Sequence, residues 1–140
     1  MKNSNKVLYS VSGKTAILTI NRPERRNALD AETLQQINIL LDRAESDEKV
    51  RVILITGQGD TFSSGFDLKD QMEKAPEGKQ WKPILELDHR TIMRFWNSPK
   101  PTIAAVKGAC LAGAFELSLA CDFTICSKHS FFGEPELKFG

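Results

Sequence analysis

Hydrophobic and polar positions along the chain follow two periods, one typical of strands and one typical of helices. Residues 7–11 and 15–20 are short, apolar and rich in β-branched side chains, which predicts two strands joined by a tight turn over residues 12–14. In residues 31–44 the apolar positions recur every three or four residues, which predicts an amphipathic helix with Asp30 as its N-cap. The apolar face of this helix consists of Leu34, Ile37, Leu40, Leu41 and Ala44.

The rest of the chain continues the alternation of strands and helices. Residues 50–56 (VRVILIT) predict a buried strand that ends in a Gly-Gln-Gly-Asp turn. The pattern further predicts a short helix after Phe66, helices at 84–96 and 114–120, and strands at 102–106, 122–126 and 130–132. Between them we expect an exposed, mobile loop at 73–82 and a small-residue turn at 108–113. This order predicts an α/β fold with mostly right-handed crossovers between strands.

Composition and charge exclude several kinds of partner. The chain has 140 residues, of which 41% are hydrophobic, so we expect one globular unit. Its 19 basic and 18 acidic residues nearly cancel, which gives no overall attraction to nucleic acid or to an anionic membrane. No apolar run reaches membrane-spanning length, and the N-terminus lacks the apolar core of a signal peptide. We therefore expect a cytoplasmic protein that binds neither nucleic acid nor membrane.

The sequence lacks the motifs of several enzyme classes. It contains no GxSxG elbow, no Walker A motif and no GxGxxG after the first strand. His89 and His129 have no acidic or cysteine partner at ligand spacing, so we expect surface residues and no metal site. Cys110, Cys121 and Cys126 lie in apolar stretches without metal-ligand spacing, which predicts reduced thiols in the core.

Two glycine-bearing turns at strand-to-helix junctions, residues 63–66 and 111–114, are the candidates for chemistry. The first turn of a helix leaves N–H groups without intrahelical partners, and these groups can receive an anion. Two such turns that converge would form an oxyanion hole, although spacing alone does not distinguish this from ordinary turn formation. Glu116 follows Gly113 by three residues, so it either complements the helix dipole or is a partly buried group with a shifted pKa. Glu134 and Glu136 flank Pro135 in an expected loop, where acids are usually solvated.

Four segments resemble, in order and spacing, those of the crotonase (enoyl-CoA hydratase/isomerase) superfamily. Residues 21–29 (NRPERRNAL) resemble its NRPxxxNAL segment, and residues 62–69 (FSSGFDLK) resemble its FxAGxDL segment. Residues 108–122 (GACLAGAFELSLACD) resemble its GxxxGGGxELxLACD segment, and residues 132–136 (FGEPE) resemble FxxPE. One departure is that the glycine triplet is Ala112-Gly113-Ala114 here, which leaves open whether the flanking backbone geometry is kept.

The resemblance implies the N-terminal portion of a spiral of ββα repeats and a set of site residues. It implies an oxyanion hole made by the N–H groups of Phe66 and Gly113, and catalytic carboxylates at Glu116 and Glu136. It also implies that coenzyme A, as part of the substrate, lies along Arg25, Arg26, Ala28, Ser64, Gly65, Asp67, Leu68 and Lys69. No metal or redox cofactor is implied. Trp81 and its neighbours belong to the region that shapes the acyl pocket in relatives.

Because both carboxylates are present, the resemblance favours an enoyl-CoA hydratase. A double-bond isomerase, a decarboxylase or a thioester hydrolase of the same superfamily remains an alternative, as does a non-catalytic acyl-CoA-binding or assembly module. The resemblance also implies a homo-oligomer, a trimer or a hexamer. It indicates that residues 1–140 form a catalytic core that stops before the C-terminal helical part. We therefore expect apolar surface without full cover at Leu117, Leu119 and Phe123.

Overall fold

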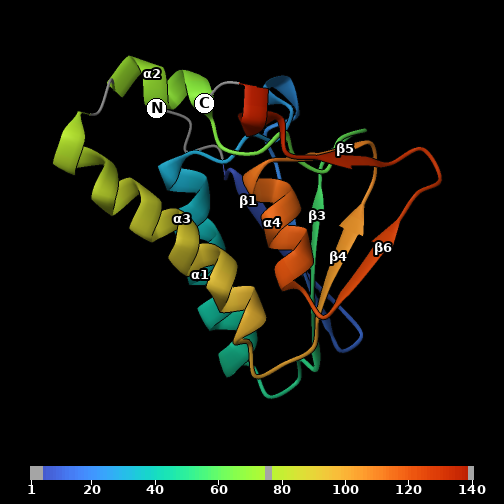
Figure 1. The fold of residues 1–140 in the computed structure, drawn as a ribbon. Helices are drawn as coiled ribbons and strands as arrows, with labels where there is room; N and C mark the ends of the chain where they lie inside the picture. The colour runs from blue at the N-terminus through green and yellow to red at the C-terminus, as the bar shows by residue number, and fades with distance from the viewer. Residues whose placement is uncertain (1–4, 75–76, 139–140) are drawn as a thin grey trace.

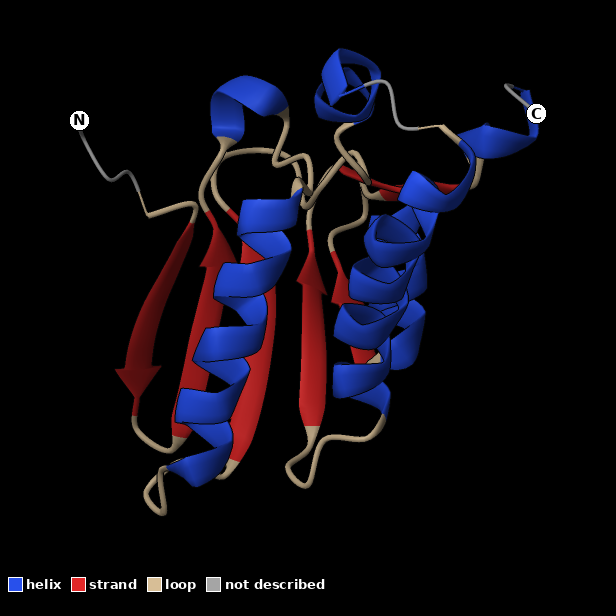
Figure 2. Ribbon diagram, turned by 90° about the vertical axis from the view of Figure 1, so that its left-hand side faces the viewer, coloured by secondary structure: helices blue, strands red, loops and turns tan. Residues whose placement is uncertain are grey.

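The structure is a computed structural model that describes residues 5–74 and 77–138; within these ranges the side chains of residues 72, 74, 136 and 137 lie outside the description. A layer of helices covers one face of a β-sheet, as two views of the ribbon show (Figure 1 and Figure 2). Among the described residues, no helix is both long enough and apolar enough to cross a membrane.

The main sheet has five strands and is mostly parallel. In spatial order they are β1 (Val7–Ser12), β2 (Thr15–Ile20), β3 (Val52–Gly57), β4 (Thr102–Val106) and β6 (Phe123–Cys126). β1 and β2 form an antiparallel hairpin, and each later neighbouring pair is parallel. A second, two-stranded sheet pairs β5 (Ala109–Leu111) with β7 (Phe131–Gly133) in parallel and lies across one end of the main sheet (Figure 1). The predicted α/β class with mostly parallel strands is confirmed.

The helices supply the layer that covers the sheet. They are α1 (Ala31–Ser46), α2 (Leu68–Lys74), α3 (Trp81–Trp96) and α4 (Gly113–Ala120), with 3-10 turns η1 (Pro23–Arg25), η2 (Gly78–Gln80) and η3 (Pro135–Lys138). α1 begins as predicted, because Oδ1 of Asp30 accepts the Thr33 N–H at 2.8 Å. Its apolar face packs on alternate residues of the sheet that are fully buried, among them Leu18, Ile53 and Ile55.

Three local predictions are corrected by the structure, one of them through pairing with a distant segment. The expected loop at 73–82 is largely helical, because α2 continues to Lys74 and α3 already begins at Trp81; residues 75–76 lie outside the described part. Pro83 is tolerated because the first turn of a helix needs no N–H partner. The expected turn at 108–113 contains β5, which exists because β7 pairs with it. The expected loop at Pro135 is η3, which proline can begin.

Burial corrects two predictions about single residues. Cys126 is exposed on β6, whereas Cys110 and Cys121 are buried as expected. Leu117 is 1% exposed and belongs to the core, because it lies on the face of α4 that meets the sheet. Leu119 and Phe123, by contrast, are each 62% exposed, as expected.

Apolar side chains gather at the C-terminal edge of the structure. All four residues of β6 are exposed, and this strand is the last of the main sheet. We call the exposed set the C-terminal apolar surface; it comprises Leu119, Phe123, Ile125, Phe131 and Phe132. Several exposed large apolar side chains on and near an edge strand are typical of a site where another polypeptide segment packs.

The burial pattern of α1 predicts a large difference between two isoleucines that are two residues apart. Ile37 is completely buried, whereas Ile39 is 65% exposed. Ile37→Ala should lower the free energy of unfolding by about 2–5 kcal/mol, because it removes buried methyl groups and leaves a cavity. Ile39→Ala is the matched control and should change it by less than about 0.5 kcal/mol in denaturant titrations. Equal losses would show that the helix presents a different face to the sheet.

Candidate active site

The two glycine-bearing turns lie side by side because they follow neighbouring parallel strands. The first follows β3, and the second follows β4 and the short β5 that comes after it, so both lie at the carboxyl edge of the main sheet. The Ser63 N–H donates to the carbonyl of Ala109 at 3.1 Å, and the Leu111 N–H donates to the carbonyl of Ser63 at 3.2 Å. These hydrogen bonds fix the turns against each other.

Glycine is required at position 65 by both conformation and space. Gly65 has a φ of 94°, in the left-handed region that side chains disfavour. A Cβ atom there would lie 2.5 Å from Cβ of Ala112 and 2.8 Å from the carbonyl oxygen of Leu111. The first turn can therefore approach the second only without a side chain.

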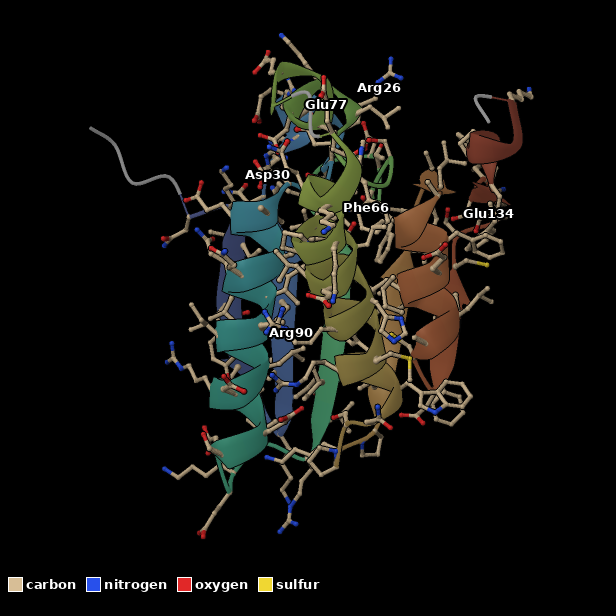
Figure 3. The ribbon with its side chains drawn as sticks, turned by 60° about the vertical axis from the view of Figure 1, so that its left-hand side comes forward. Arg26, Asp30, Phe66, Glu77, Arg90 and Glu134 are labelled. Atoms are coloured by element: carbon tan, nitrogen blue, oxygen red, sulfur yellow. The ribbon has the colours of Figure 1, made fainter. Side chains whose placement is uncertain are left out.

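Phe66 and Gly113, the predicted oxyanion donors, are in contact. A Cβ atom on Gly113 would lie 2.3 Å from two ring carbons of Phe66, so this ring lies directly over the glycine. Figure 3 shows Phe66 between α3 and α4. The amides around them are used internally, since Asp67 N–H donates to Leu29 and Ala112 N–H donates to Gly133, both at 2.9 Å. Within the described residues, the N–H groups of Phe66 and Gly113 make no hydrogen bond.

The backbone before α4 keeps a conformation typical of glycine although Ala112 stands there, and it is strained for that reason. Ala112, the N-cap of α4, has φ 55° and ψ −138°, a conformation that costs a residue with a side chain about 1–3 kcal/mol. Ala114 has no positive φ, because it already belongs to the helix. The glycine-like geometry is thus kept at one flanking position, and the Gly113 N–H points out of the helix start.

The two predicted catalytic carboxylates come from different elements. Glu116 lies in the first turn of α4, is exposed, and its N–H donates to Ala112 at 3.1 Å. Glu136 belongs to η3, and its side chain lies outside the described part of the structure. Glu134 is half-buried just before η3, and Figure 3 shows it near α4.

A buried ion-pair network anchors the turn that carries Phe66. Asp67 is 4% exposed and binds Arg22 at 3.0 Å and Arg25 at 2.7 Å. Arg22 also reaches Asp30 at 3.1 Å and donates to the carbonyl of Ala28. Burial by itself would raise the pKa of Asp67, but the Asp70 N–H and the two guanidinium groups outweigh burial and hold that pKa below its usual range.

Asn27 ties the same segment to the loop after β3. Its side chain donates to the carbonyls of Gln58 at 2.9 Å and Thr61 at 2.7 Å, and accepts the Arg22 N–H at 2.9 Å. Its φ of 55° is one that asparagine tolerates better than most residues. Residues 21–29 therefore hold the segment that follows β3 in place through hydrogen bonds.

The residues predicted to contact coenzyme A fall into three groups. Arg26, Ala28, Ser64 and Gly65 lie together, because the Ser64 N–H donates to the carbonyl of Arg26 at 3.0 Å and the Leu29 N–H donates to the carbonyl of Gly65 at 2.8 Å. Of these residues Arg26 is exposed and Ala28 is buried. In the second group, Arg25 and Asp67 form an ion pair with each other. The side chains of Leu68 and Lys69 are exposed at the start of α2, and Lys69 lies 4.0 Å from Glu73.

The sequence reasoning missed Asp88. This residue is 7% exposed on the buried stripe of α3, which also includes Thr91, Phe95 and, at its half-buried start, Ile84. The i, i+4, i+7, i+11 spacing of these residues is the signal that would have found it. Burial first, and then the negative charge of Glu116, raise the pKa of Asp88 to about 6.

The buried cysteines are not candidates for catalysis. Burial raises the pKa of Cys110 to about 11 and that of Cys121 to about 12. Both are therefore thiols at neutral pH, whereas a nucleophilic cysteine is a thiolate.

Comparison with known proteins finds enoyl-CoA hydratases among the relatives. The chain is 35% identical over 138 residues to the short-chain-enoyl-CoA hydratase of Clostridium acetobutylicum, which covers 97% of this chain and 52% of the relative. It is 36% identical over 130 residues to a putative enoyl-CoA hydratase of Thermus thermophilus, with 91% of this chain and 51% of the relative covered. The chain thus spans about half the length of the curated relatives it matches.

Solved structures agree with this result. A crystal structure of an enoyl-CoA hydratase/isomerase from Xanthobacter autotrophicus Py2 matches with a TM-score of 0.95 and 57% identity, over 96% of this chain and 51% of the other. Residues 11–140 match the family described as Enoyl-CoA hydratase/isomerase. The chain belongs to this family, the crotonases, and it has their fold.

Proposed function

We propose that this protein is an enoyl-CoA hydratase, which adds water across the double bond of a 2-enoyl-CoA thioester. One observation carries the proposal: the free N–H groups of Phe66 and Gly113 belong to adjoining turns, and Glu116 lies three residues after Gly113. The names of the relatives, and the presence of glutamate at both matching positions, support hydration over the other reactions of the family.

The N–H pair acts on the charge that develops during the reaction. Addition of water to the carbon β to the carbonyl moves electrons onto the thioester oxygen, which becomes an enolate oxygen. The N–H groups of Phe66 and Gly113 donate to this oxygen, and the positive end of α4 adds to the attraction. Each donor of such a hole contributes about 3 kcal/mol to transition-state stabilisation.

The two glutamates move the protons. One carboxylate takes a proton from the water as its oxygen bonds to the β carbon. The other carboxyl group gives a proton to the carbon next to the carbonyl, so that one water molecule is added in total. Positioned acids and bases of this type contribute about 10²–10⁴-fold each. We assign these roles to Glu116 and Glu136 as a pair.

Coenzyme A would lie along the turn segment that joins Arg26, Ala28, Ser64 and Gly65. The exposed guanidinium of Arg26 and the ammonium of Lys69 are the groups available for its phosphates. Arg25 holds Asp67 and thereby the turn, so its part in binding is indirect. We further propose that the C-terminal apolar surface is covered in the active protein by more of the same polypeptide or by a second copy in a homo-oligomer.

Substitution of the glutamates tests the catalytic assignment. Glu116→Gln and Glu136→Gln should each slow hydration of crotonyl-CoA by at least about 100-fold, because an amide neither takes up nor releases the proton. Affinity for the thioester should change little. Loss of enoyl absorbance measures the rate, and Glu134→Gln is the control that should stay near the unsubstituted rate. Full activity in either variant would remove that residue from the mechanism, and a product with a moved double bond would identify an isomerase.

Substitution of Gly113 separates the N–H group from the space around it. Gly113→Ala keeps the N–H but places a Cβ against the Phe66 ring, whereas Gly113→Pro adds similar bulk and also deletes the N–H. Gly113→Pro should therefore have a kcat about 10²–10³-fold below that of Gly113→Ala. Circular dichroism checks that both variants are folded. Equal kcat values for the two folded variants would show that the Gly113 N–H does not act on the oxyanion.

The C-terminal apolar surface predicts association of residues 1–140 when they are prepared alone. Phe123 and Ile125 each expose 62% of their surface on an edge strand, which favours pairing with another chain. Light scattering should show oligomers or aggregates, and Phe123→Ser with Ile125→Ser should reduce them. A monodisperse monomer with full hydratase activity would contradict the expectation.

A further inference from the structure

Asp88 is a buried acid whose oxygen Oδ2 accepts no hydrogen bond from any described residue. Its neighbours on the buried stripe of α3 are satisfied or apolar; Thr91, for example, accepts from Asn38 at 2.6 Å and donates to Leu87 at 2.8 Å. A buried oxygen without a donor is unfavourable, and a bound molecule that supplies the donor removes this cost.

Asp88 lines a cavity of about 150 Å³ between the beginnings of α1, α2 and α3. Much of the lining is apolar and consists of Leu29, Ala31, Pro83, Ile84 and Leu87. Its other acids are occupied: Asp30 and Asp67 bind Arg22, and Asp70 has an interaction of its own. Among the described acids of this lining, Asp88 therefore holds the oxygen that is available to a ligand.

The cavity adjoins the proposed oxyanion hole. Leu29 and Asp67 both line it, and they flank Phe66, since Leu29 pairs with Phe66 and its carbonyl accepts the Asp67 N–H. Figure 3 shows Asp30 and Phe66 on either side of the N-terminal half of α3, the helix that carries Asp88. On the other side Asp88 is close enough to Glu116 for that charge to help raise its pKa. An acyl chain whose thioester lies at Phe66 and whose double bond lies at Glu116 would continue past Asp88 into this cavity.

We infer that Asp88 is a specificity-determining residue that accepts a hydrogen bond from a hydroxyl group on the acyl chain, and that the protein prefers hydroxylated enoyl thioesters to unsubstituted ones. The inference rests on the proposed function for the position of the thioester. A simple alkyl chain would fill the cavity and leave Oδ2 of Asp88 without a hydrogen-bond donor. A site that hydrogen-bonds a hydroxyl group of its substrate discriminates against an analogue without that hydroxyl, because a buried polar group of the protein is then unpaired. An acidic chain would be repelled by Asp88 and by Glu116.

The test compares matched thioesters on the complete protein. The substrates are 2-pentenoyl-CoA and its 4-hydroxy and 5-hydroxy derivatives, and the quantity is kcat/KM. At least one hydroxylated substrate should be favoured by about 10- to 100-fold, as expected for one buried acceptor that gains or lacks its partner. Asp88→Leu, which keeps the volume and removes the acceptor, should reduce this preference to about threefold or less. Because it also removes an unpaired buried carboxyl, the variant should fold.

Controls keep the inference separate from the hydratase proposal. Glu86→Gln changes an exposed acid on the same helix and should leave the preference unchanged. Calorimetric binding of pentanoyl-CoA and 5-hydroxypentanoyl-CoA repeats the comparison without turnover, so it remains informative if hydration is not the reaction. A complete protein that favours the unsubstituted chain in both assays, or an Asp88→Leu variant that keeps the hydroxyl preference, would overturn the inference.

Discussion

The site depends on the close approach of two backbone turns that leave no room for side chains between them. β3 and β4 are parallel neighbours, so the turns that follow them emerge at the same edge of the sheet. Gly65 and Gly113 then allow one turn to touch the other, and the Phe66 ring takes the space above Gly113. In the part of the chain that the structure describes, the N–H groups of Phe66 and Gly113 then have no hydrogen-bond acceptor. The strained φ of Ala112 shows that the geometry is held by the surrounding hydrogen bonds even where glycine is absent.

The two buried aspartates near these turns, Asp67 and Asp88, have pKa values shifted in opposite directions. Burial on its own raises the pKa of any carboxyl group, and this is the largest effect at both Asp67 and Asp88. At Asp67 the Asp70 N–H and the guanidinium groups of Arg25 and Arg22 reverse the shift, which makes this acid part of the scaffold. At Asp88 no cation does so, and the charge of Glu116 adds to the effect of burial. One acid therefore stabilises the turn, whereas the other stays available to the ligand we propose.

The C-terminal apolar surface and the length of the relatives both bear on what packs beside this end of the fold. The chain spans about half of the relatives it matches, and the five exposed residues of this surface lie on α4, β6 and β7. Phe131 and Phe132 of this surface come shortly before Glu136 in the chain, at the start of the segment that leads into η3. We therefore expect cover of this surface to influence the two glutamates that we propose as acid and base.

The local pattern of residues in the sequence predicted most helices and strands and the kinds of side chain at the site. The β1–β2 hairpin, the cap at Asp30 and the buried face of α1 depend on neighbouring residues alone, so periodicity predicted them. β5, the burial of Leu117 and the exposure of Cys126 depend on which distant segment packs nearby, so local pattern failed there. Resemblance supplied the pairing of Phe66 with Gly113. Only the tertiary structure decided that Arg25 binds Asp67 and that Oδ2 of Asp88 accepts no hydrogen bond from the described residues, because burial and hydrogen bonding are properties of the packed chain.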